Sequence, residues 1–149
     1  MLRVKYDNAE RIATLLPTAM PGGDAAAQEP WRNLLARLQA QYGSYERWPQ
    51  EYKTALADHP VQAVCAAIAA GINAPLASST GRLFDAVAAA LGYAPARQSY
   101  EGEAAMRLEH AAASYISEYG QPEPLSFICH LYTSPSPRDA TLSRMPSSA

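Results

Sequence analysis

Apolar side chains recur every three or four residues through much of the chain, and this spacing places them on one face of an α-helix. The repeat is clearest after Pro60, where it runs i, i+3, i+4 and i+7 and stops at Gly71. Its members are Val61, Val64, Cys65 and Ile68. Proline is tolerated at a helix start and glycine readily ends a helix, so the pattern predicts a helix from Pro60 to Gly71.

A second apolar stripe lies earlier in the chain. Asp24 is expected to cap a short helical turn that reaches Gln28, and Pro30 is expected to restart the helix. The stripe then continues to about Gln41, and Gly43 ends it. Its members are Trp31, Leu34, Leu35 and Leu38.

Two shorter segments have weaker patterns. The β-capable run Arg11–Leu16 leads into a turn rich in proline and glycine, which predicts a short strand. An aromatic turn around Trp48 is expected to precede a short helix over residues 50–57. Because Arg47 is the only basic residue interleaved with the aromatic ones, we expect packing and not base stacking. The aromatic residues are Tyr42, Tyr45, Trp48 and Tyr52.

The segment Ser78–Ala105 predicts two helices joined by a short loop. Ser78, Ser79 and Thr80 are good N-cap residues for a helix over about 81–91, which Gly92 would end. Asp85 and Arg82 fall away from the apolar face of that helix, so Asp85 is expected at the edge of a packed face. The members of the face are Leu83, Phe84, Val87, Ala88 and Leu91. A second helix opening at Tyr100–Glu103 has its own stripe of Ala105, Leu108, Ala112, Tyr115 and Ile116.

The end of the chain has a different composition. Leu125–Cys129 is compatible with one short strand, but Leu131–Ala149 is rich in Ser, Pro, Thr and Arg and has no apolar period. Such a segment cannot offset its ordering entropy, so disorder is expected. It also resembles translated sequencing adapter, with a linker or phosphosite interpretation of SPSP as the weaker alternative. We therefore predict one partial domain over 1–128 and a non-native tail over 129–149.

Composition narrows the function classes. The chain has 149 residues, a hydrophobic fraction of 48%, a net charge of −2 and a pI near 5.9. This charge gives no reason to expect a nucleic acid or an anionic membrane as partner. There is no apolar run of membrane-spanning length and no signal pattern, so a cytoplasmic location is expected. Cys65 and Cys129 form no CxxC pair, and Cys65 is expected to be a small core residue.

Four segments resemble one family. Residues 71–79 read GINAPLASS, residues 81–92 read GRLFDAVAAALG, and residues 100–109 read YEGEAAMRLE. An earlier block, PGGDAAAQEPWRNLL at 21–35, stands in the right order. Together, over roughly 11–115, they resemble the Kae1-like domain of HypF-type carbamoyltransferases. The resemblance implies a mainly helical fragment of an α/β actin/Hsp70-like domain, and it implies that Met1 marks a truncation.

The resemblance also implies the chemistry of the parent enzyme. Carbamoyl phosphate is hydrolysed, ATP activates the carbamate as carbamoyl-adenylate, and the carbamoyl group passes to the C-terminal cysteine of HypE during [NiFe] hydrogenase maturation. The fragment alone is expected to be inactive. The alternative is a small, non-catalytic helical interaction module. The relative that modifies tRNA is disfavoured by the GRLFD and YEGE segments and by the absence of basic charge.

Site residues follow from the resemblance by position. Asp85 matches a nucleotide contact to ribose hydroxyls, and the alternative is an Arg82–Asp85 ion pair on a wet helix face. Gly102 matches by position the first glycine of the YPGG segment in the tRNA-modifying relatives, where the backbone closely approaches the nucleoside. Glu103 replaces the second glycine of that segment. Glu103 either contacts the ligand or only favours the helix start. Gly81 either permits close approach or is a tolerant first-turn residue.

No catalytic or metal-binding constellation is readable. His59, His110 and His130 lack the i, i+3 or i, i+4 spacing of a metal pair, so no metal ligand is assigned. Ser78 and Ser79 have no nearby base and are explained as caps. Glu29 and Arg32 belong to the recognisable EPWR segment, and a structural role is expected for them.

Overall fold

The structure is a computed structural model that describes residues 2–122. Within this range, residues 2–16 and 17–122 belong to two separate compact units. The expected strand at 125–129 and the expected tail at 129–149 lie outside the described residues.

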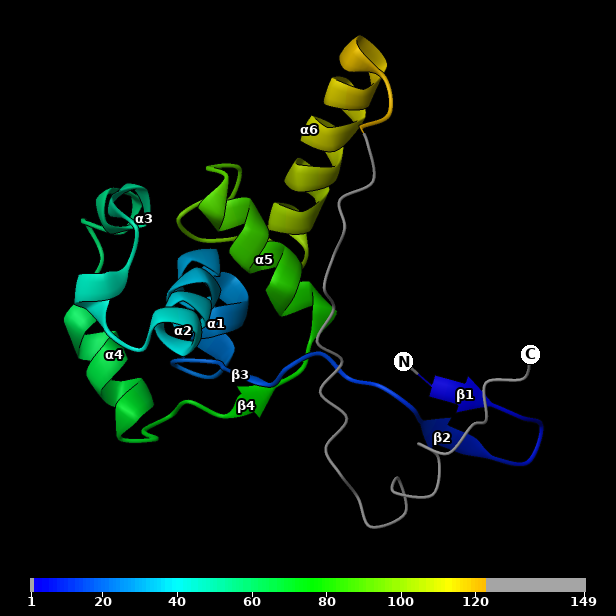
Figure 1. The fold of residues 1–149 in the computed structure, drawn as a ribbon, viewed down its shortest axis with the longest axis horizontal. Helices are drawn as coiled ribbons and strands as arrows, with labels where there is room; N and C mark the ends of the chain where they lie inside the picture. Colours follow the sequence, from blue (N-terminus) through cyan, green and yellow to red (C-terminus); the bar gives the residue numbers. More distant parts are fainter. Residues whose placement is uncertain (1, 123–149) are drawn as a thin grey trace, which may run out of the picture. The chain divides into compact units, whose positions relative to one another are not determined.

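The first unit contains a β-hairpin. Strands β1 (Leu2–Val4) and β2 (Ala9–Arg11) are antiparallel, with Leu2 opposite Arg11 and Val4 opposite Ala9 (Figure 1). The strand expected over Arg11–Leu16 is wrong, because only Arg11 is in a strand. A strand needs a hydrogen-bonded neighbour, and the neighbouring segments pair with residues 9–11 and 18–19 instead.

The second unit is mainly helical (Figure 1). Its only described sheet joins β3 (Thr18–Ala19) to β4 (Leu76–Ala77) in antiparallel register, with Thr18 opposite Ala77. The helical elements in chain order are α1 (Asp24–Gln28), α2 (Pro30–Tyr42), the 3-10 turn η1 (Tyr45–Arg47), α3 (Gln50–Ala55), α4 (Val61–Ala69), α5 (Thr80–Ala90) and α6 (Glu103–Tyr119). These bounds confirm the mainly helical prediction.

Most helix boundaries lie close to the expected residues, although α4 (Val61–Ala69) is shorter than the expected Pro60–Gly71 and one expected cap is wrong. Pro30 is the first residue of α2, and Gly43 ends it at a φ of 77°. The side chain of Ser79 caps α5 by accepting a hydrogen bond from the Arg82 N–H. The cap expected of Asp24 is wrong: Gly23 occupies the N-cap position, and Asp24 is already the first helical residue. There its charge can favour the helix start only through the helix dipole.

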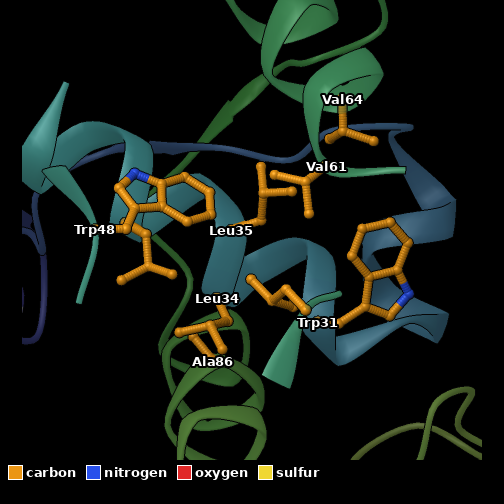
Figure 2. Close-up of a cluster of buried hydrophobic side chains, with 9 residues drawn as sticks. Trp31, Leu34, Leu35, Trp48, Val61, Val64 and Ala86 are labelled. Atoms are coloured by element: carbon orange, nitrogen blue, oxygen red, sulfur yellow. The ribbon is translucent and has the colours of Figure 1, made fainter. Parts of the chain in front are cut away.

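The core is built around α2. Trp31, Leu34 and Leu35 of this helix are buried, and Figure 2 shows Leu34 turned toward Ala86 on α5 and Leu35 toward Val61 of α4. Trp48 is buried in the same cluster, while Tyr42, Tyr45, Tyr52 and Cys65 pack against it. The packing role expected for the aromatic residues is therefore confirmed, whereas Cys65 is only partly buried and packs against the core cluster.

The packed face expected on α5 is wrong. Three of its members are exposed, with 46% of Phe84, 37% of Val87 and 60% of Leu91 accessible to solvent. Asp85 and Ala86 are buried, together with Ala88, which is the one predicted member that is fully buried. Small side chains let α5 approach α2 closely, so the alanine face packs against α2 and the face with larger side chains points outward.

Only the first turn of α6 is buried among the described residues. Glu103 and Ala104 are buried, whereas Tyr115 and Ile116, farther along the predicted stripe, are exposed. The apolar stripe is present in the sequence. Within the described part of the chain, other residues shield only its beginning from solvent, where α6 contacts α5.

Candidate functional site

Three helices meet at a small polar cluster. The C-terminal end of α1, the middle of α5 and the first turn of α6 converge on Gln98, which lies in the loop between α5 and α6. We call the side chains of Arg82, Asp85 and Gln98 the Asp85 cluster. Asp85 and Gln98 are buried, and the Arg82 side chain is 11% exposed.

Asp85 is the buried acid of this cluster. Only 1% of the residue is exposed, although the sequence places it at the edge of a packed face. Its Oδ1 accepts a hydrogen bond from Gln98 Nε2 at 3.3 Å. Its Oδ2 lies 3.0 Å from Arg82 Nε, an ion pair that lacks hydrogen-bond geometry. The ion pair weighed against ligand contact is thus present, but it is buried and not on a wet face.

Burial raises the pKa of Asp85, because removal from water disfavours the charged carboxylate. The Arg82 guanidinium and the hydrogen bond from Gln98 lower that pKa, and the nearby negative charge of Glu101 raises it further. The ionised form of Asp85 therefore depends on its two partners in the cluster.

Gln98 is a member of the site that the sequence motifs do not identify. It is 7% exposed and joins residues far apart in the chain, since its Nε2 also donates to the carbonyl oxygen of Ala27 at 2.9 Å. Its Oε1 accepts from the N–H of Ala104 at 2.9 Å. A single glutamine in a loop without periodicity carries no signal that would have revealed this role.

Gly102 and Glu103 begin α6. Gly102 has a left-handed φ of 84°, and an added Cβ would meet nothing within 4 Å, so the backbone conformation and not crowding within this chain requires glycine. The Glu103 carboxylate accepts from the N–H of Ser99 at 2.7 Å and from Arg107 at 2.6 Å. The bond from Ser99 is the main cause that lowers the pKa of Glu103. The carboxylate of Glu103 is thus already engaged.

The structure brings together some of the predicted site residues but not all. Gln98 bridges Asp85 to the N–H of Ala104, two residues after Gly102, so Asp85 and the start of α6 share one hydrogen-bond network. Gly81 lies in the first turn of α5 outside this network. An added Cβ there would meet Ser79 Oγ at 3.6 Å, an ordinary contact that indicates no close approach within the chain.

A hollow of about 500 Å³ adjoins the Asp85 cluster, which is within the range of small-molecule sites. It lies between the end of α1 and the loop before α6. Its polar lining comes from Gln28, Arg97, Gln98, Ser99, Tyr100 and Glu101. The hollow and the cluster share Gln98, so a ligand in the hollow would lie one side chain away from Asp85.

Glu29 and Arg32 hold the same region together. The Glu29 carboxylate forms an ion pair with Arg32, three residues later in the chain. It also lies 3.6 Å from the guanidinium of Arg97, in the loop between α5 and α6. Arg97 also donates to the Gln28 side chain. Arg32 in turn lies over the Trp31 ring, 4.6 Å from its centroid. These contacts give Glu29 and Arg32 the structural role expected of them.

The histidines within the described range have separate positions. His59 stacks on Trp31 with 4.2 Å between ring centroids, and His110 is on the exposed part of α6. His130 lies outside that range. Residues 2–122 contain no group of three or more His, Cys, Asp or Glu side chains placed to hold a metal ion. Over the same residues, no helix is both long and apolar enough to cross a membrane.

Comparisons with known sequences agree with the motifs. The family model described as carbamoyltransferase, Kae1-like domain, second subdomain, matches residues 1–134. The chain is 55% identical over 108 residues to carbamoyltransferase HypF of Rhodobacter capsulatus, covering 72% of this chain and 14% of that protein. It is 41% identical over 106 residues to carbamoyltransferase HypF of Rhizobium leguminosarum bv. viciae, covering 71% of this chain and 13% of the relative.

Solved structures show the same likeness. Full-length HypF in its phosphate- and nucleotide-bound form superimposes with a TM-score of 0.61 at 31% identity, over 72% of this chain and 14% of that one. HypF of T. kodakarensis superimposes with a TM-score of 0.61 at 34% identity, over 75% of this chain and 16% of that one. The chain therefore spans about one seventh of these relatives, and it belongs to the HypF carbamoyltransferase family, as part of the second subdomain of the Kae1-like domain.

Proposed function

We propose that this chain supplies part of the wall of a nucleotide site in a HypF-type carbamoyltransferase. The observation that carries the proposal is the Asp85 cluster, in which one oxygen of a buried carboxylate accepts no hydrogen bond. A carboxylate is an acceptor-only group and suits the hydroxyl pair of a ribose. A solved relative is described as nucleotide-bound, which supports the same class of ligand.

In this proposal the residues of the chain bind and orient the ligand. Asp85 Oδ2 accepts from a ribose hydroxyl once Arg82, whose side chain is 11% exposed, turns away from it. The left-handed turn at Gly102 leaves the backbone at the start of α6 open to a ligand, since nothing lies within 4 Å of its missing side chain. Glu103 holds that turn in place through Ser99, and Gly81 keeps the first turn of α5 unobstructed.

The chemistry of the proposed parent enzyme consumes carbamoyl phosphate and ATP. Carbamoyl phosphate is hydrolysed to carbamate, and ATP activates the carbamate as carbamoyl-adenylate. The carbamoyl group is then transferred to the C-terminal cysteine thiolate of a HypE-like acceptor for [NiFe] hydrogenase maturation. The location proposed for this enzyme is the cytoplasm. Any metal used in that reaction would be held by residues other than those described in this chain.

A graft tests the proposal. Residues 11–115 of this chain replace the aligned segment of R. capsulatus HypF, and carbamoyl transfer to its HypE-like acceptor is measured. We expect the graft to retain transfer, because the segment supplies an equivalent wall of the site. A folded graft without transfer would contradict the proposal.

The 149-residue chain alone is the complementary sample. We expect no transfer from it, because it spans only about one seventh of the length of its relatives. Measurable carbamoyl transfer by this chain would contradict the assigned wall role.

A second candidate function is a non-catalytic helical interaction module. The exposed apolar side chains of α5 and α6 favour it, among them Phe84, Met106 and Tyr115. Nucleotide titration of the graft separates the two candidates. Binding that depends on Asp85 supports the nucleotide site, and binding indifferent to Asp85 supports the interaction module.

A further inference from the structure

Gln98 uses almost the whole hydrogen-bonding capacity of its amide groups. Its backbone N–H donates to the carbonyl oxygen of Gln28 at 2.7 Å. Both Nε2 hydrogens are used, one toward Ala27 and one toward Asp85, and Oε1 accepts from Ala104. The opposite amide orientation would place Oε1 against a carbonyl and a carboxylate oxygen, so the network fixes the orientation.

The four bonds join three helices that are distant in sequence. Ala27 and Gln28 are the last residues of α1, Asp85 is in the middle of α5, and Ala104 is in the first turn of α6. Among the described residues, no hydrogen bond links Asp85 directly to α6. The relation between the carboxylate and the left-handed turn at Gly102 therefore depends on this one side chain.

No other residue type reproduces this set of bonds. Glutamate has the same length but no donor for Asp85 or for the Ala27 carbonyl, and methionine has neither donor nor strong acceptor. Asparagine is one methylene shorter. Only glutamine therefore supplies two donors and one acceptor at this length, and these bonds fix the positions of the groups that they join.

Gln98 also influences the charge of Asp85. A hydrogen bond donated to a carboxylate favours its ionised form. The charged groups that act on Asp85 are Arg82 of α5 and Glu101 of the loop before α6, and they act in opposite directions. Loss of the Gln98 donor would therefore raise the pKa of Asp85 further.

We propose that Gln98 is a positioning residue of the nucleotide site, which holds the Asp85 carboxylate and the first turn of α6 in one arrangement. This inference rests on the proposed function of the chain. It adds a residue that touches Asp85 and borders the adjoining hollow, and that the sequence motifs did not identify.

The test uses the full-length graft in R. capsulatus HypF, with ATP as the probe. Gln98→Glu keeps the acceptor for Ala104 but removes both donors, and Gln98→Met removes the whole set. We expect each variant to weaken ATP binding about tenfold at pH 7, corresponding to about 1.4 kcal/mol. We also expect the midpoint of the pH dependence of ATP binding to move upward. Gln39→Glu and Gln39→Met are matched controls, because the Gln39 side chain donates only to the Gly43 carbonyl just after α2, and their affinities should stay unchanged.

The pH profile separates positioning from general stability. An equal loss of affinity at every pH, with an unmoved midpoint, would overturn the proposal, as would unchanged affinity in folded Gln98 variants. Failure of both variants to fold would assign Gln98 to stability alone and would also overturn it. If Asp85→Ala weakens ATP binding while folded Gln98 variants do not, the proposed function stands and only this inference fails. If Asp85→Ala has no effect, both fail.

Discussion

The two faces of α5 have opposite surroundings. The inward face carries small side chains and an acid, and it is buried against α2 and the loop before α6. The outward face carries large apolar side chains, Phe84 and Val87 with Leu91 at the helix end, and it is exposed in the described part of the chain. Whether a residue of α5 is buried therefore depends on which other elements pack against its face of the helix. An acid with two partners is buried here, while a leucine at the end of the same helix stays exposed.

The largest expected effect is the loss of stability when a core leucine is replaced, compared with a leucine on the outer face of α5. Leu35 is fully buried on α2, and Leu35→Ala should lower the free energy of unfolding by about 2–5 kcal/mol, through lost burial and a residual cavity. Leu91→Ala is the matched control on the outer face, where a change within about 0.5 kcal/mol is expected. Urea denaturation followed by circular dichroism measures both. Equal losses in the two variants would contradict the assigned burial.

A smaller effect is expected when the acid of the inward face is removed. Asp85→Ala leaves the 11% exposed Arg82 side chain without its partner and should cost about 1–3 kcal/mol of unfolding free energy. Glu10→Ala removes an exposed pair, in which Arg3 Nη1 and Glu10 Oε2 are 3.7 Å apart, and should cost less than about 1 kcal/mol. The same denaturation measurement compares them, and a larger loss in Glu10→Ala would contradict the account.

The pH dependence of stability should differ in sign between the two buried acids of the site. The pKa of Asp85 is raised in the folded chain, so its contribution to stability is fully present below about 3.9 and is lost as the pH rises through the raised value. The pKa of Glu103 is lowered, so its contribution is present above about 4.3 and is lost as the pH falls through the lowered value.

Urea midpoints between pH 3 and pH 7 measure these two contributions. The stability of the unsubstituted chain relative to Asp85→Asn should decrease as the pH rises. Its stability relative to Glu103→Gln should increase over the same range. The same sign for both variants would contradict either the burial of the Asp85 carboxylate or the hydrogen bond from Ser99 to Glu103.

Much of the fold was predictable because local signals decide it. Proline at the first position of α2, glycine after its last turn and the Ser79 cap of α5 act within a few residues of the boundaries that they set. The periodic apolar residues of α2 and α4 also pack as expected, since both helices contribute to one described cluster.

The site was predictable only in part. The family motifs single out Asp85 and the start of α6, but the pattern along α5 places Asp85 at an edge and not inside. Which face of a helix is buried depends on its neighbours, and these come from α1, α2 and a loop that are distant in sequence. Gln98 could not be found at all, because its role consists of bonds to residues 6, 13 and 71 positions away.

The most direct test of the nucleotide site is an ATP titration of the full-length graft by isothermal calorimetry. Asp85→Ala is compared with Glu51→Ala, a substitution of an exposed acid on α3. We expect Asp85→Ala to weaken ATP binding about tenfold or more and Glu51→Ala to leave the affinity unchanged. An unchanged affinity in folded Asp85→Ala would contradict the account and return Asp85 to the role of an ion-pair partner of Arg82.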